Sequence, residues 1–232
     1  ILYRDADEKD EEPEEECKPD DESSDGEPDE EKAKTDNKGH KTENKAFEPN
    51  KNSPVKPYTL GEEIFNSVSH GVGSLLAIAA IVLLIVFSPK RPMVITSVSI
   101  YGASMILLYT MSCLYHAFTN MRVKKVFQIF DHVSIYLLIA GTYTPYCLVN
   151  LGGAFGWTMF GIIWGLAALG ITIYSVFGNK MRKISSITYI FMGWLVLIAF
   201  IPLKNALPKG SFSMLTWGGL IYTAGFAFYS AK

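Results

Sequence analysis

Six long stretches of mostly apolar residues, separated by short polar joints, dominate the second part of the chain. They cover about residues 64–87, 93–118, 127–149, 154–177, 186–203 and 211–231. A helix needs about 20 mostly apolar residues to cross the hydrocarbon core of a bilayer. Gly, Pro, Ser and Thr within the stretches agree with this, because neighbouring helices satisfy the backbone groups that such residues free. The pattern predicts an all-α membrane protein, a helical bundle with six transmembrane helices.

The charged residues divide the chain into two parts. Residues 1–57 hold 20 of the 23 acidic and 10 of the 21 basic residues, with almost no large apolar side chains. Such a segment cannot bury enough apolar surface to offset the entropy lost on ordering, so we predict a disordered acidic N-terminal tail and linker. Residues 58–232 keep three acidic and 11 basic residues and form the predicted transmembrane domain.

The basic residues in the joints predict an orientation. With alternate joints assigned to opposite sides, nine Lys and Arg fall on one side, including those of the 119–126 joint, and four on the other. Cytoplasmic joints carry the excess of basic residues, so the N-terminus is expected to be cytoplasmic. We therefore expect an integral protein of the plasma membrane whose partners are membrane lipids and not nucleic acid. Assembly into a homo-oligomer is left open.

Two sequence signals predict helix starts. Thr59 is a suitable N-cap, and Glu62 and Glu63 follow where acidic side chains favour the positive end of the helix dipole. Pro92 is placed to open the second helix, because its fixed φ suits a first helical position.

Polar and ionisable side chains gather near the expected cytoplasmic end of the first three helices. In chain order they are Glu63, Asn66, His70, Ser112, His116 and Asp131. Spacings of three and four place the first three on one face of the first helix and the next two on one face of the second. An ionisable side chain inside a bilayer is costly and usually faces the bundle interior, which makes these residues candidates for a functional site.

The residue types leave several interpretations open. His116 and Asp131 lie at similar depth on either side of a short joint, and imidazole and carboxylate are the usual zinc ligands. However, the sequence contains no His-x-x-x-His pair, and His116 with Ser112 could serve helix packing alone. Glu63, Asn66 and His70 could likewise tie the first helix to a neighbour. Asp131 is the hardest to explain structurally, because a carboxylate at this depth needs a cation, a metal or a proton.

His132 is turned about 100° from Asp131 along the third predicted helix. Placement near the lipid headgroups is the expectation for it.

Three motifs resemble those of a known family. "EEIFNSVSHGVG", "SCLYHAF" and "FDHVSIYLLIAGTYTPY", in this order and with this helix spacing, resemble the hemolysin III proteins, the mostly bacterial branch of the progestin and adipoQ receptor family. The resemblance covers about residues 58–232 and implies a seven-helix bundle with a cytoplasmic N-terminus. It also implies an intramembrane zinc held by the histidine of a Ser-x-x-x-His motif, which His116 matches together with Ser112. The aspartate expected close to the metal water is matched by Asp131, and the polar face of helix one is matched by Glu63, Asn66 and His70.

The resemblance further implies two histidine ligands in a His-x-x-x-His motif on a seventh helix. The sequence ends at Lys232, where the sixth helix is expected to finish, so we expect a C-terminally truncated chain with an incomplete metal site.

The resemblance implies competing functions. One is a zinc-dependent, ceramidase-like hydrolase of lipid amides, in which Asp131 and Ser112 are catalytic and His116 and Asp131 hold zinc, or a protein of lipid homeostasis. The alternative is a pore-forming cytolysin, or a receptor or channel without hydrolase activity. The residues themselves, rather than the resemblance, leave open a third option, a proton-coupled transporter with His70, His116 and Asp131 as a relay.

Overall fold

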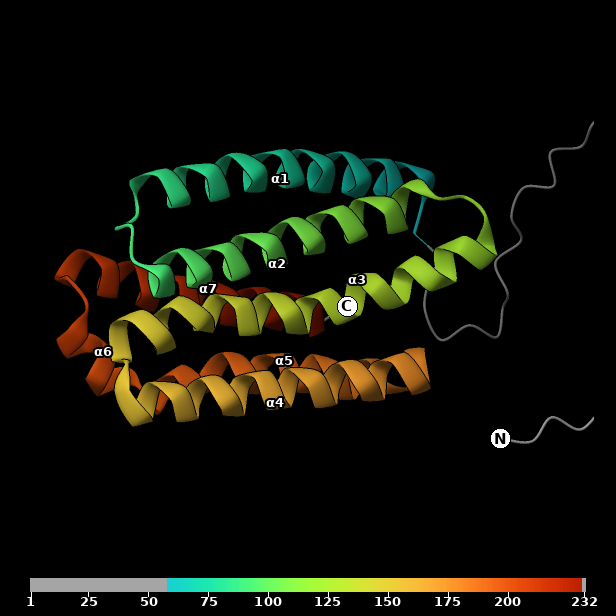
Figure 1. The fold of residues 1–232 in the computed structure, drawn as a ribbon. Coiled ribbons are helices and arrows are strands. Elements are labelled where there is room, and N and C mark those ends of the chain that lie inside the picture. The colour runs from blue at the N-terminus through green and yellow to red at the C-terminus, as the bar shows by residue number, and fades with distance from the viewer. Residues whose placement is uncertain (1–57, 231–232) are drawn as a thin grey trace, which may run out of the picture. The chain divides into compact units, whose positions relative to one another are not determined.

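The computed structural model describes residues 58–230, so the predicted disordered tail lies outside the described residues. Within that range all regular secondary structure is helical (Figure 1). The α-helices are α1 (Leu60–Phe87), α2 (Pro92–Ala117), α3 (Met121–Pro145), α4 (Gly153–Phe177), α5 (Arg182–Trp194), α6 (Phe200–Ala206) and α7 (Lys209–Ser230). Short segments of tighter or wider helix join some of them: the π-helix η1 (Tyr146–Leu151) and the 3-10 turns η2 (Gly178–Met181) and η3 (Leu195–Leu197).

The predicted signals start the first two helices. The Thr59 side chain accepts a hydrogen bond from the Glu62 N–H, and the Glu62 carboxylate accepts one from the Thr59 N–H, which together form a capping box. Pro92 is the first residue of α2, as expected.

The apolar helices have the length and composition of membrane spans. Four stretches meet both requirements: Leu60–Phe87, Pro92–Ala117, Met121–Leu151, and Gly153–Leu197, which joins α4 to α5. The large side chains of α1 face outward, with Leu75 69% and Phe87 81% exposed, and a soluble protein would not leave such a surface in water. The prediction of a helical membrane bundle is confirmed.

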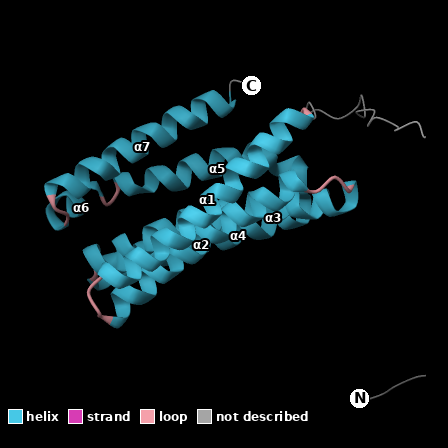
Figure 2. Ribbon diagram, turned by 90° about the horizontal axis from the view of Figure 1, so that it is seen from above, coloured by secondary structure: helices cyan, strands magenta, loops and turns pink. Residues whose placement is uncertain are grey.

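Consecutive helices pack side by side from α1 to α4. At one end, here called the α2–α3 end, lie the start of α1, the α2–α3 joint and the α4–α5 turn; at the other, the α1–α2 end, lie the α1–α2 joint and η1 (Figure 1). α7 contacts α5 and α6, and Figure 2 shows it running beside α5.

The best-buried core lies between α3, α4 and α5. Its members are Tyr136, Ala140, Ile163, Ala167, Tyr189 and Met192. Close approach depends on small residues: a Cβ added at Gly170 of α4 would overlap the Tyr136 ring of α3. Tyr143 of α3 adds polar ties to α5, because its hydroxyl lies 2.9 Å from the carbonyl oxygens of Met192 and Gly193.

The third helix begins earlier than its apolar residues suggest. The predicted span started near residue 127, whereas α3 starts at Met121 with Asn120 as its N-cap. The Asn120 side chain accepts hydrogen bonds from the N–H groups of Arg122 and Val123. The basic residues expected in a joint at 119–126 therefore form the first turns of a helix.

The predicted span 186–203 is interrupted. α5 ends at Trp194, a 3-10 turn follows, and α6 begins at Phe200. Pro202 lies in the first turn of α6, and a proline ring collides with the carbonyl four residues earlier if the helix continues through it. The break around Ala199 accommodates this ring.

Candidate functional site

The candidate site lies at the α2–α3 end and centres on Glu63. The Glu63 Oε2 atom is 2.6 Å from His116 Nδ1, and its Oε1 atom is 2.7 Å from Lys124 Nζ. These three residues, called here the Glu63 triad, come from α1, α2 and α3. All three side chains are less than 20% exposed. The two contacts of Glu63 are therefore shielded from water more than a surface salt bridge is.

Each member of the triad lies near a helix end, and for Glu63 and His116 that end suits the charge which the side chain can carry. Glu63 lies in the first turn of α1, where the helix dipole favours a carboxylate. His116 lies in the last turn of α2, next to free carbonyl groups. Lys124 lies in the first turns of α3 because Asn120 starts that helix early. The helix starts at Thr59 and Asn120 thus set the positions of Glu63 and Lys124 along their helices, and the packing of the three helices brings the triad together.

The triad determines which nitrogen of His116 is available. Lys124 stabilises the ionised form of Glu63, and an ionised carboxylate only accepts hydrogen bonds. The short contact therefore requires that His116 Nδ1 carries the proton. In the neutral ring, Nε2 then keeps its lone pair and can act as a metal ligand or as a proton acceptor.

His70 lies beside the triad, two turns along α1 from Glu63. Its ring centroid is 6.2 Å from that of His116 and 5.9 Å from that of Tyr109. Among the residues that the structure describes, His70 Nδ1 is the one buried side-chain nitrogen or oxygen atom without a hydrogen-bond partner. A second imidazole nitrogen is therefore open for a ligand next to His116.

Asp131 faces the same region from α3. It is close enough to interact electrostatically with His70 on α1 and with Tyr115 on α2. Its side chain is 17% exposed, and its Oδ2 atom lies 3.8 Å from His132 Nδ1. The carboxylate thus borders the histidine pair without being held by Lys or Arg in the described range.

The remaining two predicted residues lie nearby, and within the described residues neither side chain forms a hydrogen bond or ion pair with the triad. Ser112 is 3% exposed, one turn before His116 on α2. Asn66 is half-buried one turn after Glu63, and its backbone carbonyl accepts a hydrogen bond from Ser69.

The expected placement of His132 near the headgroups stays a prediction, and the structure shows how its ring is packed. The ring stacks flat on Tyr174 of α4, with 5.1 Å between centroids, and its Nδ1 lies 2.8 Å from the Gln128 carbonyl oxygen. Only 15% of the side chain is exposed. Spacing along α3 does not reveal this aromatic partner on α4.

A polar chain that sequence reasoning missed extends from the site to the α4–α5 turn. Asn179 Nδ2 donates to Gln128 Oε1 at 3.0 Å, and Gln128 Nε2 donates to the Tyr115 hydroxyl at 3.2 Å. Tyr115 in turn lies against His116, with 4.6 Å between ring centroids. The chain ties the position of His116 to two other parts of the bundle, α3 and the α4–α5 turn.

Lys124 is the member of the triad that the sequence analysis does not place in the candidate site. There it counts only as a basic residue of a joint. Its spacing carried more information, because Lys124, Gln128 and Asp131 follow each other at intervals of four and three and so share one helical face.

The implied zinc can be compared with the donor groups of the described residues. No group of three or more His, Cys, Asp or Glu side chains within residues 58–230 is arranged to hold a metal ion, whereas a catalytic zinc has three protein ligands. The donor chemistry nevertheless suits zinc: His116 presents Nε2 while a carboxylate holds its other nitrogen, which is the usual outer-shell arrangement for a ligating histidine.

The helices and the polar cluster at one end define an integral membrane protein with an ionisable site inside the bundle. Residues 58–232 match the family described as Haemolysin-III related. The chain belongs to this family.

Individual relatives agree with this assignment. "Hemolysin-3" of Bacillus cereus is 44% identical over 170 residues, which cover 72% of this chain and 78% of that protein. "Hemolysin-3 homolog" of Bacillus subtilis (strain 168) is 43% identical over 177 residues, covering 75% and 83%. "Monocyte to macrophage differentiation factor" of Homo sapiens is 27% identical over 137 residues, covering 57% and 56%.

Proposed function

We propose that this protein is a zinc-dependent hydrolase of lipid amides whose site is built around His116. The observation that carries the proposal is the contact between Glu63 Oε2 and His116 Nδ1, which leaves Nε2 available to bind a ligand. His70, with its unpartnered nitrogen, borders the same space. Additional ligands would have to come from outside the described residues.

The residues of the candidate site would have separate roles in this reaction. His116 would hold the metal through Nε2, and Glu63 and Lys124 would fix the orientation and tautomer of that ring. Zinc, when bound, supplies a Lewis acid that makes water a nucleophile near neutral pH. Asp131 would accept the proton of the attacking water, and Ser112 would donate a hydrogen bond to the oxygen that becomes negative at the amide carbon.

The site would act on lipids from one side of the membrane. We propose that the α2–α3 end faces the cytoplasm and that the protein resides in the plasma membrane. Six basic residues within residues 58–230 support this orientation: Arg122, Lys124, Lys125, Lys180, Arg182 and Lys183.

The test compares two histidines of similar burial. We expect the purified full-length protein to contain one zinc per chain by elemental mass spectrometry, and His116→Ala to lose most of it. His132→Ala is the matched control and should keep the zinc, because that ring stacks on Tyr174 and its Nδ1 bonds the Gln128 carbonyl oxygen. Asp131→Ala should retain metal but lose hydrolysis of a ceramide by at least 100-fold, the lower range for general base catalysis.

A wild-type protein without zinc would contradict the proposal. Dye release from liposomes distinguishes the alternative: leakage that is unchanged in His116→Ala, without ceramide hydrolysis, would instead identify a pore-forming cytolysin.

A further inference from the structure

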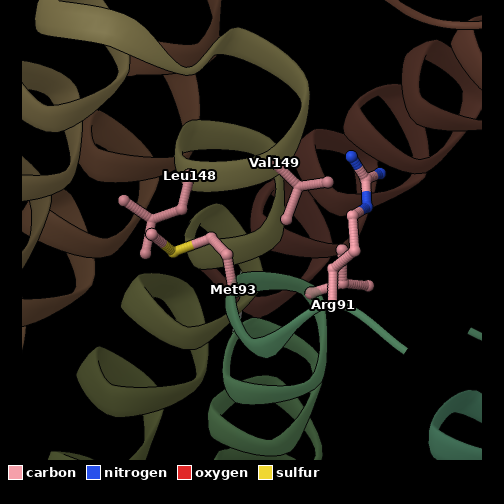
Figure 3. A pocket seen from close by; sticks show the side chains of 5 residues that line it. Arg91, Met93, Leu148 and Val149 are labelled. Carbon is pink, nitrogen blue, oxygen red and sulfur yellow. The ribbon is translucent and has the colours of Figure 1, made fainter. Parts of the chain in front are cut away.

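A small pocket lies at the α1–α2 end, opposite the Glu63 triad along the bundle. Arg91, Met93 and Val94 line it from the start of α2, and Leu148 and Val149 line it from η1 (Figure 3). Its volume is about 100 Å³, equivalent to about three water molecules. Sites for whole drug-sized ligands are about 300 Å³ or larger. The pocket therefore suits one compact chemical group.

The cation of this pocket has no carboxylate partner. Within residues 58–230 the ion pairs involve Glu63 and Asp131, both at the other end of the bundle, and none involves Arg91. The neighbouring Lys90 is already engaged, because its Nζ donates to the carbonyls of Ile85 at 2.6 Å and Val86 at 3.0 Å. Arg91 thus offers a free positive charge, whereas Lys90 caps the end of α1.

The remaining walls are apolar and come from an unusual segment. In Figure 3, the Arg91 side chain extends beside Val149, while Met93 and Leu148 lie on the opposite side. Leu148 and Val149 belong to the six-residue π-helix η1, which directly follows Pro145. π-helical segments are rare and are frequent at functional sites. The pocket combines one unpaired guanidinium with apolar surface.

The position of the pocket points to its occupant. The α1–α2 joint connects two candidate membrane spans and so lies at a membrane surface. A phospholipid there presents a phosphate at the level of the joint and acyl chains along the helices. We propose that this pocket binds the phosphate of an anionic phospholipid, with Arg91 as the recognising cation and the apolar walls contacting the glycerol and upper acyl carbons.

The test uses native mass spectrometry of the full-length protein released from mixed micelles of phosphatidylglycerol and phosphatidylcholine. Wild type should retain one phosphatidylglycerol in preference to phosphatidylcholine. Arg91→Gln should lower the retained fraction about fivefold, the effect of one basic residue at an anionic surface. Lys90→Gln removes the same charge one residue away and should retain the lipid, because that ammonium bonds to α1.

A second variant tests the cavity independently of the charge. Val149→Trp keeps Arg91 but fills the pocket, and it should also lose the bound phosphatidylglycerol, while its thermal midpoint in detergent shows whether it is folded. Equal retention by Arg91→Gln and wild type, or equal loss in Lys90→Gln and Arg91→Gln, would overturn the proposal. Equal binding of the two lipids by wild type would contradict the preference for an anionic phospholipid, because phosphatidylcholine carries the same phosphate beside a quaternary ammonium.

Discussion

At the scale of single residues, Glu63 is the link that organises the α2–α3 end. Each of its carboxylate oxygens has its own partner, one imidazole and one ammonium, from two different helices. Removing the charge would leave Lys124 partly buried without a counter-ion, and losing one member of a buried pair costs more than the pair contributes when intact. Glu63 therefore affects stability and the orientation of His116 together.

This arrangement predicts that the same Glu→Gln substitution changes the free energy of unfolding more at Glu63 than at Glu62. Glu63→Gln should lower the free energy of unfolding by about 2 kcal/mol, because a charged hydrogen bond is worth about 1.5–3 kcal/mol and this one is partly exposed. Glu62→Gln should change it by less than about 0.5 kcal/mol, since Gln also completes a capping box. Denaturant unfolding in mild detergent measures both. Similar losses in the two variants would show that the Glu63 triad does not stabilise the fold.

At the scale of helices, close packing of α3 against α4 depends on a missing side chain. A Cβ at Gly170 would meet the Tyr136 ring, which is 2% exposed and cannot move outward. Gly165 lies in the same helix with open space around it. The packing of α4 thus requires a residue without a side chain at position 170 but not at position 165.

Alanine at these two positions should separate packing from helix propensity. Gly170→Ala should destabilise the protein by about 1–3 kcal/mol, because overpacking a tight core displaces neighbours. Gly165→Ala should leave stability unchanged or raise it by up to about 1 kcal/mol, because Ala is the better helix former. Thermal unfolding in detergent reports both changes. A Gly170→Ala variant as stable as the wild type would mean that α3 and α4 can move apart at little cost in free energy.

The helices were largely predictable because membrane spans leave a long apolar signal in the sequence. The start of α3 could not be predicted from hydropathy, because Arg122 and Lys124 are polar and therefore resemble a joint between spans. The N-cap Asn120, which starts the helix, does not raise the local hydropathy. The break after Trp194 was missed because Pro202 lies eight residues downstream, within an otherwise apolar run. Apolar composition identifies spans, whereas caps and prolines determine their ends.

At the scale of the whole molecule, the candidate residues could be assigned to one end but not to specific pairs. Helical spacing and depth placed Glu63, His70, His116 and Asp131 near one another. The choice of His116 as the partner of Glu63 depends on how α1 and α2 rotate against each other, which one helix's pattern does not encode. The polar chain through Asn179 was also invisible, because it joins residues 51 positions apart.

The proposed orientation predicts which joints are accessible from outside the cell. In a Cys17→Ser background, Pro89→Cys should react with a membrane-impermeant maleimide on intact cells, because the α1–α2 joint faces outward. Lys180→Cys, in the α4–α5 turn, should react only after lysis. Both positions are exposed in the structure, so burial does not mask the label. The reverse labelling pattern would show that the protein has the opposite orientation in the membrane, with the Glu63 triad on the outer side.

The capping box at Thr59 has a consequence for how this domain can be recombined. The start of α1 is encoded within four consecutive residues, Thr59 to Glu62, whose side chains and backbone satisfy each other. The start of α1 is thus specified by a local signal within the membrane domain. A protein engineer can therefore exchange the segment that precedes Tyr58 while the capping box keeps the beginning of the first membrane helix.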